Sequence, residues 1–160
     1  MRLINFHKFE SIVRKAYRFG DTDQSVTQYV HPFDARNIHQ NLPDNIKMLF
    51  DDGHYSQATF EAFKYLDKEI QRISSTKENG YKLMMKVFGG STPVIALNKL
   101  SNQSEIDEQE GYKFIFAGGM LAIRNPRGHE YSIKDDPDVC LDHLSLASLL
   151  IRKLQEAGYK

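Results

Sequence analysis

The sequence predicts an all-α fold, most simply a helical bundle, and two observations carry that prediction. Apolar residues recur at three- and four-residue steps through several long segments, which is the spacing of one buried helix face. No segment shows the two-residue alternation of a half-buried strand, and no internal repeat interrupts the pattern. At 160 residues the chain can bury one good core, so we expect one domain plus an extension.

The extension is predicted over residues 1–40, in front of a helical domain over residues 41–160. Residues 3–19 carry apolar side chains at helical steps and are expected to form a first helix. Polar residues then dominate as far as residue 42, which predicts a linker. Within it the stretch from His31 to Phe33 is expected to be extended, because the residue before a proline avoids helical angles.

Three helices are predicted between residues 43 and 88. Pro43, at a first helical position, begins a short helix through Phe50, and Gly53 ends it. His54 to Ser74 has the pattern of a long amphipathic helix, and Tyr81 to Phe88 that of a short one. The apolar stripe of the long helix consists of Tyr55, Ala58, Ala62, Leu66, Ile70 and Ile73, widened by Phe60 and Phe63.

The next helix is expected to begin at a capping box, Ser104 to Asp107, and to lie at the centre of the fold. Nearly every residue from Tyr112 to Ile123 is apolar or small, so this helix is either central to a core or shared with a partner surface. Gly118 and Gly119 each weaken a helix by about 1 kcal/mol relative to Ala, which predicts a close backbone approach there. Because the apolar surface exceeds what one core needs, we expect a homodimer whose interface includes residues 108–124.

The last helix is predicted to begin with Asp136 as its N-cap and Pro137 at its first position, and to end at Gly158. Its apolar stripe consists of Cys140, Leu144, Ala147, Ile151 and Leu154. His143 falls on the opposite side of the helix from this stripe and is expected at the surface.

A compact polar segment, Arg124 to Glu130, follows the apolar helix and is where chemistry is expected. Pro126 disfavours helical angles at Asn125 and removes a helix donor, so the helix is predicted to end or kink near Arg124. Gly128 would then allow a tight turn that brings His129 back towards Arg124. A charged guanidinium beside a titratable imidazole suits phosphate chemistry. The alternative is structural, because cations and a nearby proline are ordinary at a helix C-terminus.

The string Arg124-Asn125-x-x-x-His129 at the end of an apolar helix resembles the Arg-x4-6-His signature of the HEPN superfamily. More of the chain is similar to one branch of it, the Ymh-type bacterial family of hypothetical proteins. The resembling segments span about three quarters of the chain and lie at residues 31–39, 49–63, 110–130 and 141–154.

The resemblance implies an HEPN-like four-helix bundle, with the N-terminal helical extension and short extra helices added to it, that dimerises and cleaves RNA without a metal. His129 would remove the proton of a ribose 2′-hydroxyl, Arg124 would stabilise charge on the phosphate, and Asn125 would orient the site. The products would be a 2′,3′-cyclic phosphate and a 5′-hydroxyl. Such proteins act as toxins or as effectors of abortive infection in phage defence, so an antitoxin is a possible partner.

Three further residues are candidates for binding the RNA phosphates: Arg127, Glu61 and Lys64. Arg127 belongs to the polar segment, and the other two lie on the long helix, where HEPN enzymes can add a polar residue to the Arg/His pair. The alternative function is a catalytically inactive HEPN dimerisation module that binds nucleotide, RNA or a protein partner. A second pair, Arg36 and His39, lies outside the motif spacing, and its role is left open between structure and function.

Composition excludes several other classes of function. Lysine plus arginine and aspartate plus glutamate both number 21, so no global basic field points to nucleic acid and any such site must be local. The single cysteine excludes an intrachain disulfide and a cysteine zinc site, and the six histidines lack tight ligand spacing, so we expect no metal and no cofactor. Neither a signal peptide nor an 18-residue apolar run is present, which predicts a cytoplasmic protein without a membrane partner.

Overall fold

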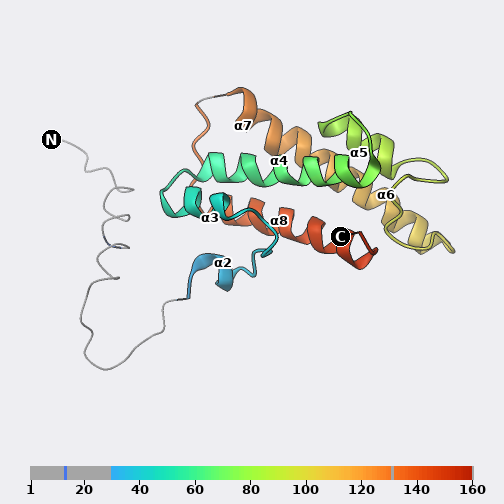
Figure 1. The fold of residues 1–160 in the computed structure, drawn as a ribbon, viewed down its shortest axis with the longest axis horizontal. Coiled ribbons are helices and arrows are strands. Elements are labelled where there is room, and N and C mark those ends of the chain that lie inside the picture. The colour runs from blue at the N-terminus through green and yellow to red at the C-terminus, as the bar shows by residue number, and fades with distance from the viewer. Residues whose placement is uncertain (1–12, 14–29, 131, 160) are drawn as a thin grey trace.

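A computed structural model describes residue 13 and residues 30–130 and 132–159. The helix predicted over residues 3–19 lies outside the described residues, apart from Val13, which is helical. Within the described part the chain forms helices and no strand, which confirms the all-α class (Figure 1). None of these helices is both long and apolar enough to cross a membrane. In chain order the elements are α2 (Pro32–Ala35), α3 (Asp44–Asp51), α4 (Tyr55–Ser74), α5 (Gly80–Phe88), α6 (Gln103–Gly118), the π-helix η1 (Gly119–Arg124), α7 (Asn125–His129) and α8 (Pro137–Glu156).

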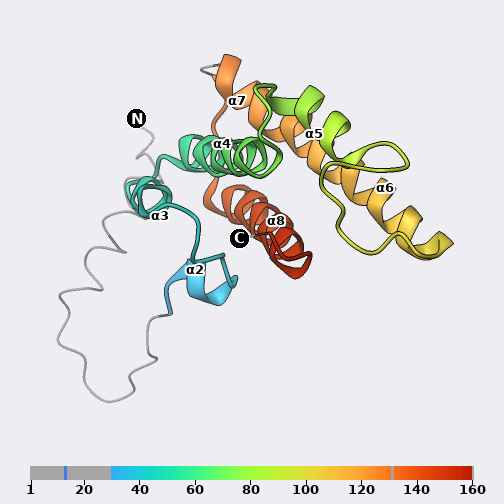
Figure 2. The same cartoon turned by 45° about the vertical axis from the view of Figure 1, so that its right-hand side comes forward.

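The other helices are arranged around α4. It lies beside α8, and the two run in the same direction, whereas α6, η1 and α7 form one continuous rod that runs the opposite way (Figures 1 and 2). This rod packs on α4 through η1 and α7, α5 packs on α6, and α3 lies against α4. The helix expected at the centre, residues 108–124, therefore has one side on the bundle, and α4 takes the central place.

The core is built from the stripes that the sequence predicted. Ala58, Ala62, Leu66 and Ile70 of α4 are buried, as are the predicted apolar residues of α8. Phe88 of α5 stacks on Phe116 of α6 with ring centroids 4.4 Å apart. Buried Gln109 fastens the loop between these helices, because its side-chain nitrogen donates to the carbonyls of Phe88 and Ile95 and its oxygen accepts from the Leu97 amide.

The predicted helix end near Arg124 was wrong, because the rod formed by α6, η1 and α7 stays helical as far as His129. Asn125 has helical angles, φ −63° and ψ −46°, and its amide donates to the Met120 carbonyl five residues back. The wider π turn explains how Pro126 is accommodated, because it relieves the clash between the proline ring and the preceding turn. Arg127 also donates from Nη1 to the Ile123 carbonyl, at 2.9 Å, which satisfies an acceptor in the same region.

The two central glycines differ in what surrounds them. A Cβ on Gly119 would lie 2.8 Å from Cε1 of Phe63, so a close approach is present there, made by a ring of α4 rather than by a backbone. A Cβ on Gly118 would have nothing within 4 Å beyond its own helix. Of these two glycines, Gly119 is therefore the one that packing within a single chain requires.

The helix starts follow the predicted chemistry with small shifts in position. Asp136 caps α8 by accepting from the Val139 amide at 2.8 Å, as predicted. The cap of α6 is Asn102 rather than Ser104, and its side chain accepts from the Glu105 amide at 3.0 Å. Pro43 is the N-cap of α3 rather than its first residue. These differences are small and change no packing face.

The segment from His31 to Leu42 packs against the bundle. His31 is extended as predicted, but Pro32 begins the one-turn helix α2, because the His31 ring accepts from the Phe33 amide at 3.1 Å. The His39 amide donates to Ser148 Oγ of α8 at 2.9 Å. The predicted boundary near residue 40 thus falls within a segment bonded to α8, and the division into an extension and a domain stays a prediction.

Candidate functional site

The predicted site residues lie where η1 and α7 cross α4. Gly128 does not make the predicted tight turn, since α7 remains helical as far as His129. Instead, Gly128 lets the ring of Phe60 approach, and a Cβ at this position would lie 2.8 Å from Phe60 Cε2. The prediction that this position needs a glycine was correct, but the reason is the packing of Phe60 against it and not the freedom of its backbone angles.

Two predicted site residues meet at the ring of Phe60. The guanidinium carbon of Arg124 lies 5.6 Å from the ring centroid, and Lys64 Nζ lies 5.8 Å from it. A cation at this distance is attracted by the negative face of an aromatic ring. We call Phe60, Lys64, Arg124 and Gly128 the Phe60 cluster. Phe60 itself was assigned to the core stripe, and no sequence signal shows that a distant arginine and a nearby lysine share its ring.

Arg124 has no carboxylate partner among the described residues. Its Nη1 donates to Asn125 Oδ1 at 3.3 Å, a long and weak hydrogen bond. Its Nε is buried without a hydrogen-bond partner in the structure. Buried donors are usually satisfied, and a guanidinium keeps its charge at any physiological pH. Arg124 therefore offers donors and a full positive charge to an anion.

Arg127, three residues further on, is fully engaged with the protein. Its Nε donates to Asp135 Oδ2 at 2.6 Å and its Nη2 to Asp135 Oδ1 at 2.5 Å. Its Nη1 donates to the Ile123 carbonyl. The two side chains are only 8% and 5% exposed. Asp135 is held in turn, because its amide donates to Ser56 Oγ at 2.8 Å, and that hydroxyl donates to the Ile133 carbonyl. This network ties α7 and the following loop to the start of α4.

Glu61 and Lys64 form an ion pair on α4, with Nζ 3.0 Å from Oε1. Lys64 reaches the Phe60 cluster, whereas Glu61 also lines a pocket between α3 and α4. The structure thus brings Lys64 to Arg124 and Asn125. It places Glu61 at the margin of that group, where it partly neutralises the lysine.

His129 is the last residue of α7 and is exposed. It lies five residues beyond Arg124 on a continuous helix, which corresponds to roughly 140° around an α-helix. Within the described part of the chain, no hydrogen bond, ion pair or ring contact joins His129 to the Phe60 cluster. One chain therefore presents the arginine and the histidine on different sides of the same rod.

His143 and Cys140, both on α8, lie near the Arg127–Asp135 pair. His143 is half-buried rather than at the surface as predicted, and its Nδ1 is buried without a hydrogen-bond partner among the residues that the structure describes. Burial, with Arg127 as the second cause, lowers the pKa of His143. Burial raises the pKa of the Cys140 thiol to about 11, so this cysteine stays protonated and acts in packing.

Arg36 and His39 have structural partners. Arg36 pairs with Asp142 at 2.8 Å, and His39 bonds through Nε2 to Gln155 at 2.9 Å. Both contacts hold the segment before α3 on α8, which favours the structural reading of this pair. In the described residues, no group of three or more His, Cys, Asp or Glu side chains is placed to hold a metal ion.

An exposed apolar face runs along α6 and η1 towards the site. Phe114 is 56% and Leu121 50% exposed, and Ile115 is exposed beside them. Phe114, Gly118, Leu121 and Asn125 follow one another at steps of four, three and four residues, so they share one side of the rod. The apolar face therefore leads directly to the segment that carries Arg124.

The chain matches the model of a known protein family. Residues 36–154 match the family described as "Protein of unknown function (Hypoth_ymh)", which covers most of the sequence. The chain belongs to this family. No curated protein and no solved structure matches it.

Proposed function

We propose that this family member is a metal-independent endoribonuclease of the HEPN type that acts as a homodimer. The observation that carries the proposal is the state of Arg124: a half-buried guanidinium beside an aromatic ring, without a carboxylate partner among the described residues. A phosphate is the anion that such a planar fork binds best, because two parallel hydrogen bonds match its geometry.

His129 supplies the proton chemistry in this proposal. As a neutral imidazole it removes the proton of a ribose 2′-hydroxyl, and the freed oxygen attacks the adjacent phosphorus. The bond from phosphorus to the 5′-oxygen breaks, which gives a 2′,3′-cyclic phosphate, and the leaving oxygen takes a proton from the protonated His129 of the second subunit. Arg124 stabilises the negative charge that develops on the phosphoryl oxygens.

The neighbouring residues divide into two groups. Lys64 adds a second positive charge near Arg124, Glu61 holds that lysine, and Asn125 orients the Arg124 fork. We assign Arg127 to positioning in place of the phosphate contact expected from its sequence, since all three nitrogens of its guanidinium already donate to the protein.

The homodimer accounts for two features of the single chain. Arg124 and His129 lie on different sides of the rod, so a second subunit can supply the histidine that faces a given arginine. The exposed apolar face of Phe114, Ile115 and Leu121 gives the two subunits a surface to bury, and it ends at Asn125. Gly118, which has no atom of the same chain near an added Cβ beyond its own helix, allows two rods to approach closely.

Light scattering tests the dimer. Leu121→Glu places a charge in the exposed apolar face, so we expect a monomer at micromolar concentration where the wild type is a dimer. Leu149→Glu is the matched control, because Leu149 is also exposed but lies on α8. A monomeric wild type, or equal dissociation by both variants, would contradict this interface.

The second candidate is a catalytically inactive module that dimerises and binds nucleotide, RNA or a protein partner such as an antitoxin. The exposed apolar face and the zero formal net charge favour it. A role as a toxin or phage-defence effector belongs to the ribonuclease proposal and rests on the same site.

Cleavage of total RNA in EDTA separates the two candidates. We expect the wild type to cut RNA, and Arg124→Ala and His129→Ala each to lose about 10²-fold or more in rate, the usual range for a general base or an oxyanion donor. His54→Ala is the control, since His54 is also an exposed histidine and is not one of the proposed site residues. If both site variants fold and cut RNA as the wild type does, the assignment is wrong. A wild type that binds but never cuts RNA supports the inactive module.

A further inference from the structure

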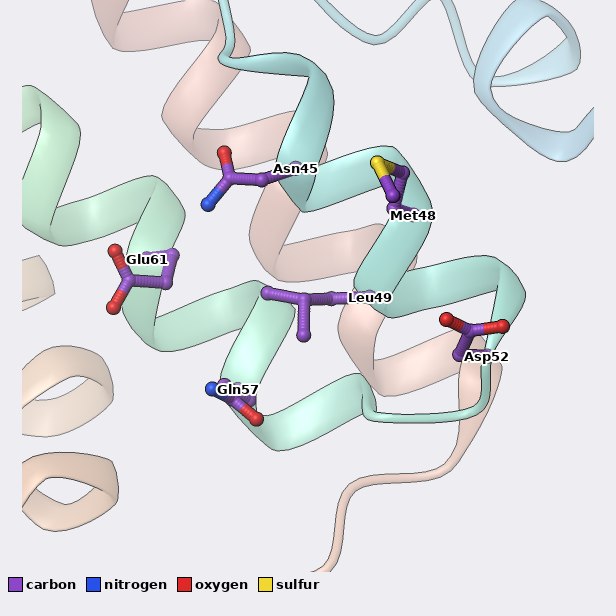
Figure 3. Close-up of a pocket in the computed structure, with 6 residues that line it drawn as sticks. All are labelled: Asn45, Met48, Leu49, Asp52, Gln57 and Glu61. Atoms are coloured by element: carbon purple, nitrogen blue, oxygen red, sulfur yellow. The ribbon is translucent and has the colours of Figure 1, made fainter.

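A pocket between α3 and α4 has only one lining residue, Glu61, in the site proposed above. Figure 3 shows Asn45 and Leu49 extending from α3 towards α4, where Gln57 and Glu61 lie. The residues that line it are Asn45, Met48, Leu49, Asp52, Gln57 and Glu61. The pocket lies between the two helices and is largely open to solvent.

The pocket adjoins the proposed phosphate site through two side chains. Glu61 lines the pocket and at the same time binds Lys64, with Nζ 3.0 Å from its carboxylate. Lys64 and Arg124 then share the ring of Phe60. Gln57 and Lys64 are seven residues apart on α4, which is about 10 Å along the helix. An RNA strand whose phosphate lies at Arg124 therefore has a neighbouring nucleotide within reach of the pocket.

The chemistry of the lining excludes a second phosphate. It contains two carboxylates, Asp52 and Glu61, and no lysine or arginine. An occupant must present hydrogen-bond donors to these carboxylates and an apolar surface to Leu49 and Met48. A nucleobase with an exocyclic amino group meets both requirements, because its faces are apolar and its edge carries N–H donors.

We propose that this pocket binds the base next to the cleaved phosphate and prefers adenine; the proposal rests on the ribonuclease function. Asn and Gln amides pair with the N6 amino group and N7 of adenine, and Asn45 and Gln57 both line the pocket. A carboxylate accepts from an amino group. Uracil carries no amino group and turns its carbonyl oxygens towards the carboxylates, so it is the least favoured base.

Cleavage of matched oligoribonucleotides tests the preference. The substrates differ only in the base beside a single cleavable phosphate. We expect kcat/KM for adenine to exceed that for uracil about tenfold, which is the lower end of what one good bidentate contact contributes. Gln57→Ala and Asn45→Ala should each reduce this ratio severalfold, mainly through a lower kcat/KM for the adenine substrate. Gln40→Ala is the control, since Gln40 is exposed and outside the pocket. A ratio that neither pocket variant alters would overturn the proposal.

Binding of nucleosides tests the pocket without catalysis. Adenosine carries no phosphate, so it probes the base site alone. We expect adenosine to shift the NMR signals of the Met48 and Leu49 methyl groups, uridine to shift them far less, and Gln57→Ala to remove the difference. If adenosine leaves these signals unmoved while Arg124→Ala abolishes cleavage, the pocket assignment fails and the ribonuclease stands. If adenosine binds but the wild type never cuts RNA, the base site stands without the reaction.

Discussion

Arg124 and Arg127 lie three residues apart on one continuous rod, yet their surroundings are opposite in kind. Arg127 is 8% exposed and paired with a buried carboxylate by two short hydrogen bonds. Arg124 rests against Phe60, and within the described part of the chain it has one weak hydrogen bond, to Asn125, and a buried Nε donor without a partner. A guanidinium that is saturated by protein acceptors contributes to the fold, whereas one left with free donors is suited to binding an anion. The difference separates a structural arginine, Arg127, from Arg124, the one proposed to bind the phosphate.

The largest expected effect is on stability at the Arg127 pair. Asp135→Ala leaves Arg127 buried and unpaired, so we expect the free energy of unfolding to fall by about 3–5 kcal/mol, as for other broken buried pairs. Arg124→Ala removes one cation–ring contact and should cost about 1 kcal/mol or less. Denaturation in urea measures both.

A double replacement gives the control for that comparison. Arg127→Met combined with Asp135→Leu removes both charges and keeps apolar volume, so it should be far less destabilising than Asp135→Ala alone. Equal losses for Asp135→Ala and Arg124→Ala would show that the two arginines do not differ as the contacts indicate.

Gly128 and Gly118 differ in their packing, as Arg127 and Arg124 differ in their partners. A Cβ at Gly128 would lie 2.8 Å from the Phe60 ring, so Gly128→Ala should cost about 1–3 kcal/mol through overpacking and move the ring that Arg124 rests on. Gly118 is helical with open space around it, and Gly118→Ala should stabilise each chain by up to about 1 kcal/mol. Thermal unfolding under conditions where the protein is monomeric measures both changes. A stabilising Gly128→Ala would contradict the packing against Phe60.

The smallest expected effect is the pH dependence of stability that His143 causes beside the Arg127–Asp135 pair. His143 faces Arg127, Asp135 and Asp142, and burial followed by Arg127 holds its pKa below the ordinary value of 6.5. The unfolded chain therefore binds the proton more tightly than the folded one. The contribution of neutral His143 to stability is complete above pH 6.5 and is lost as the pH falls through that value towards the lower folded pKa.

Replacing the imidazole isolates this contribution. We expect the urea midpoint of the wild type to fall more steeply from pH 7.5 to pH 5.5 than that of His143→Gln, because only the wild type carries the group with a lowered pKa. Parallel curves would mean that His143 titrates alike in the folded and unfolded chains.

Local sequence chemistry predicted the parts of the fold that depend on neighbours along the chain. The apolar stripe of α4, the Asp136 cap and Pro137 at the start of α8 were all correct, since each needs only helical spacing or a residue type at a helix end. Pro126 was misread because a π turn upstream accommodates it, and no residue pattern announces that turn. The residue pattern also does not predict that Asp135, in the loop after α7, pairs with Arg127.

The candidate site also has residues that the sequence predicted and one that it did not. Arg124, Asn125 and His129 were predicted from their spacing and a family resemblance, and their catalytic roles stay predictions. The structure adds Phe60, which joins Lys64 on its own helix to Arg124 on another. That meeting depends on how α4 crosses the rod, which is a property of the packed chain and not of either segment.

The central claim is that Arg124, and not Arg127, meets the phosphate of the RNA. NMR of the arginine Nε–H groups tests it most directly, with a 2′-O-methyl dinucleotide that binds but cannot be cleaved. Arg124→Lys and Arg127→Lys assign the two signals. We predict that the Arg124 signal shifts on titration while the Arg127 signal stays in place. A shift of Arg127 with Arg124 unmoved would contradict the account.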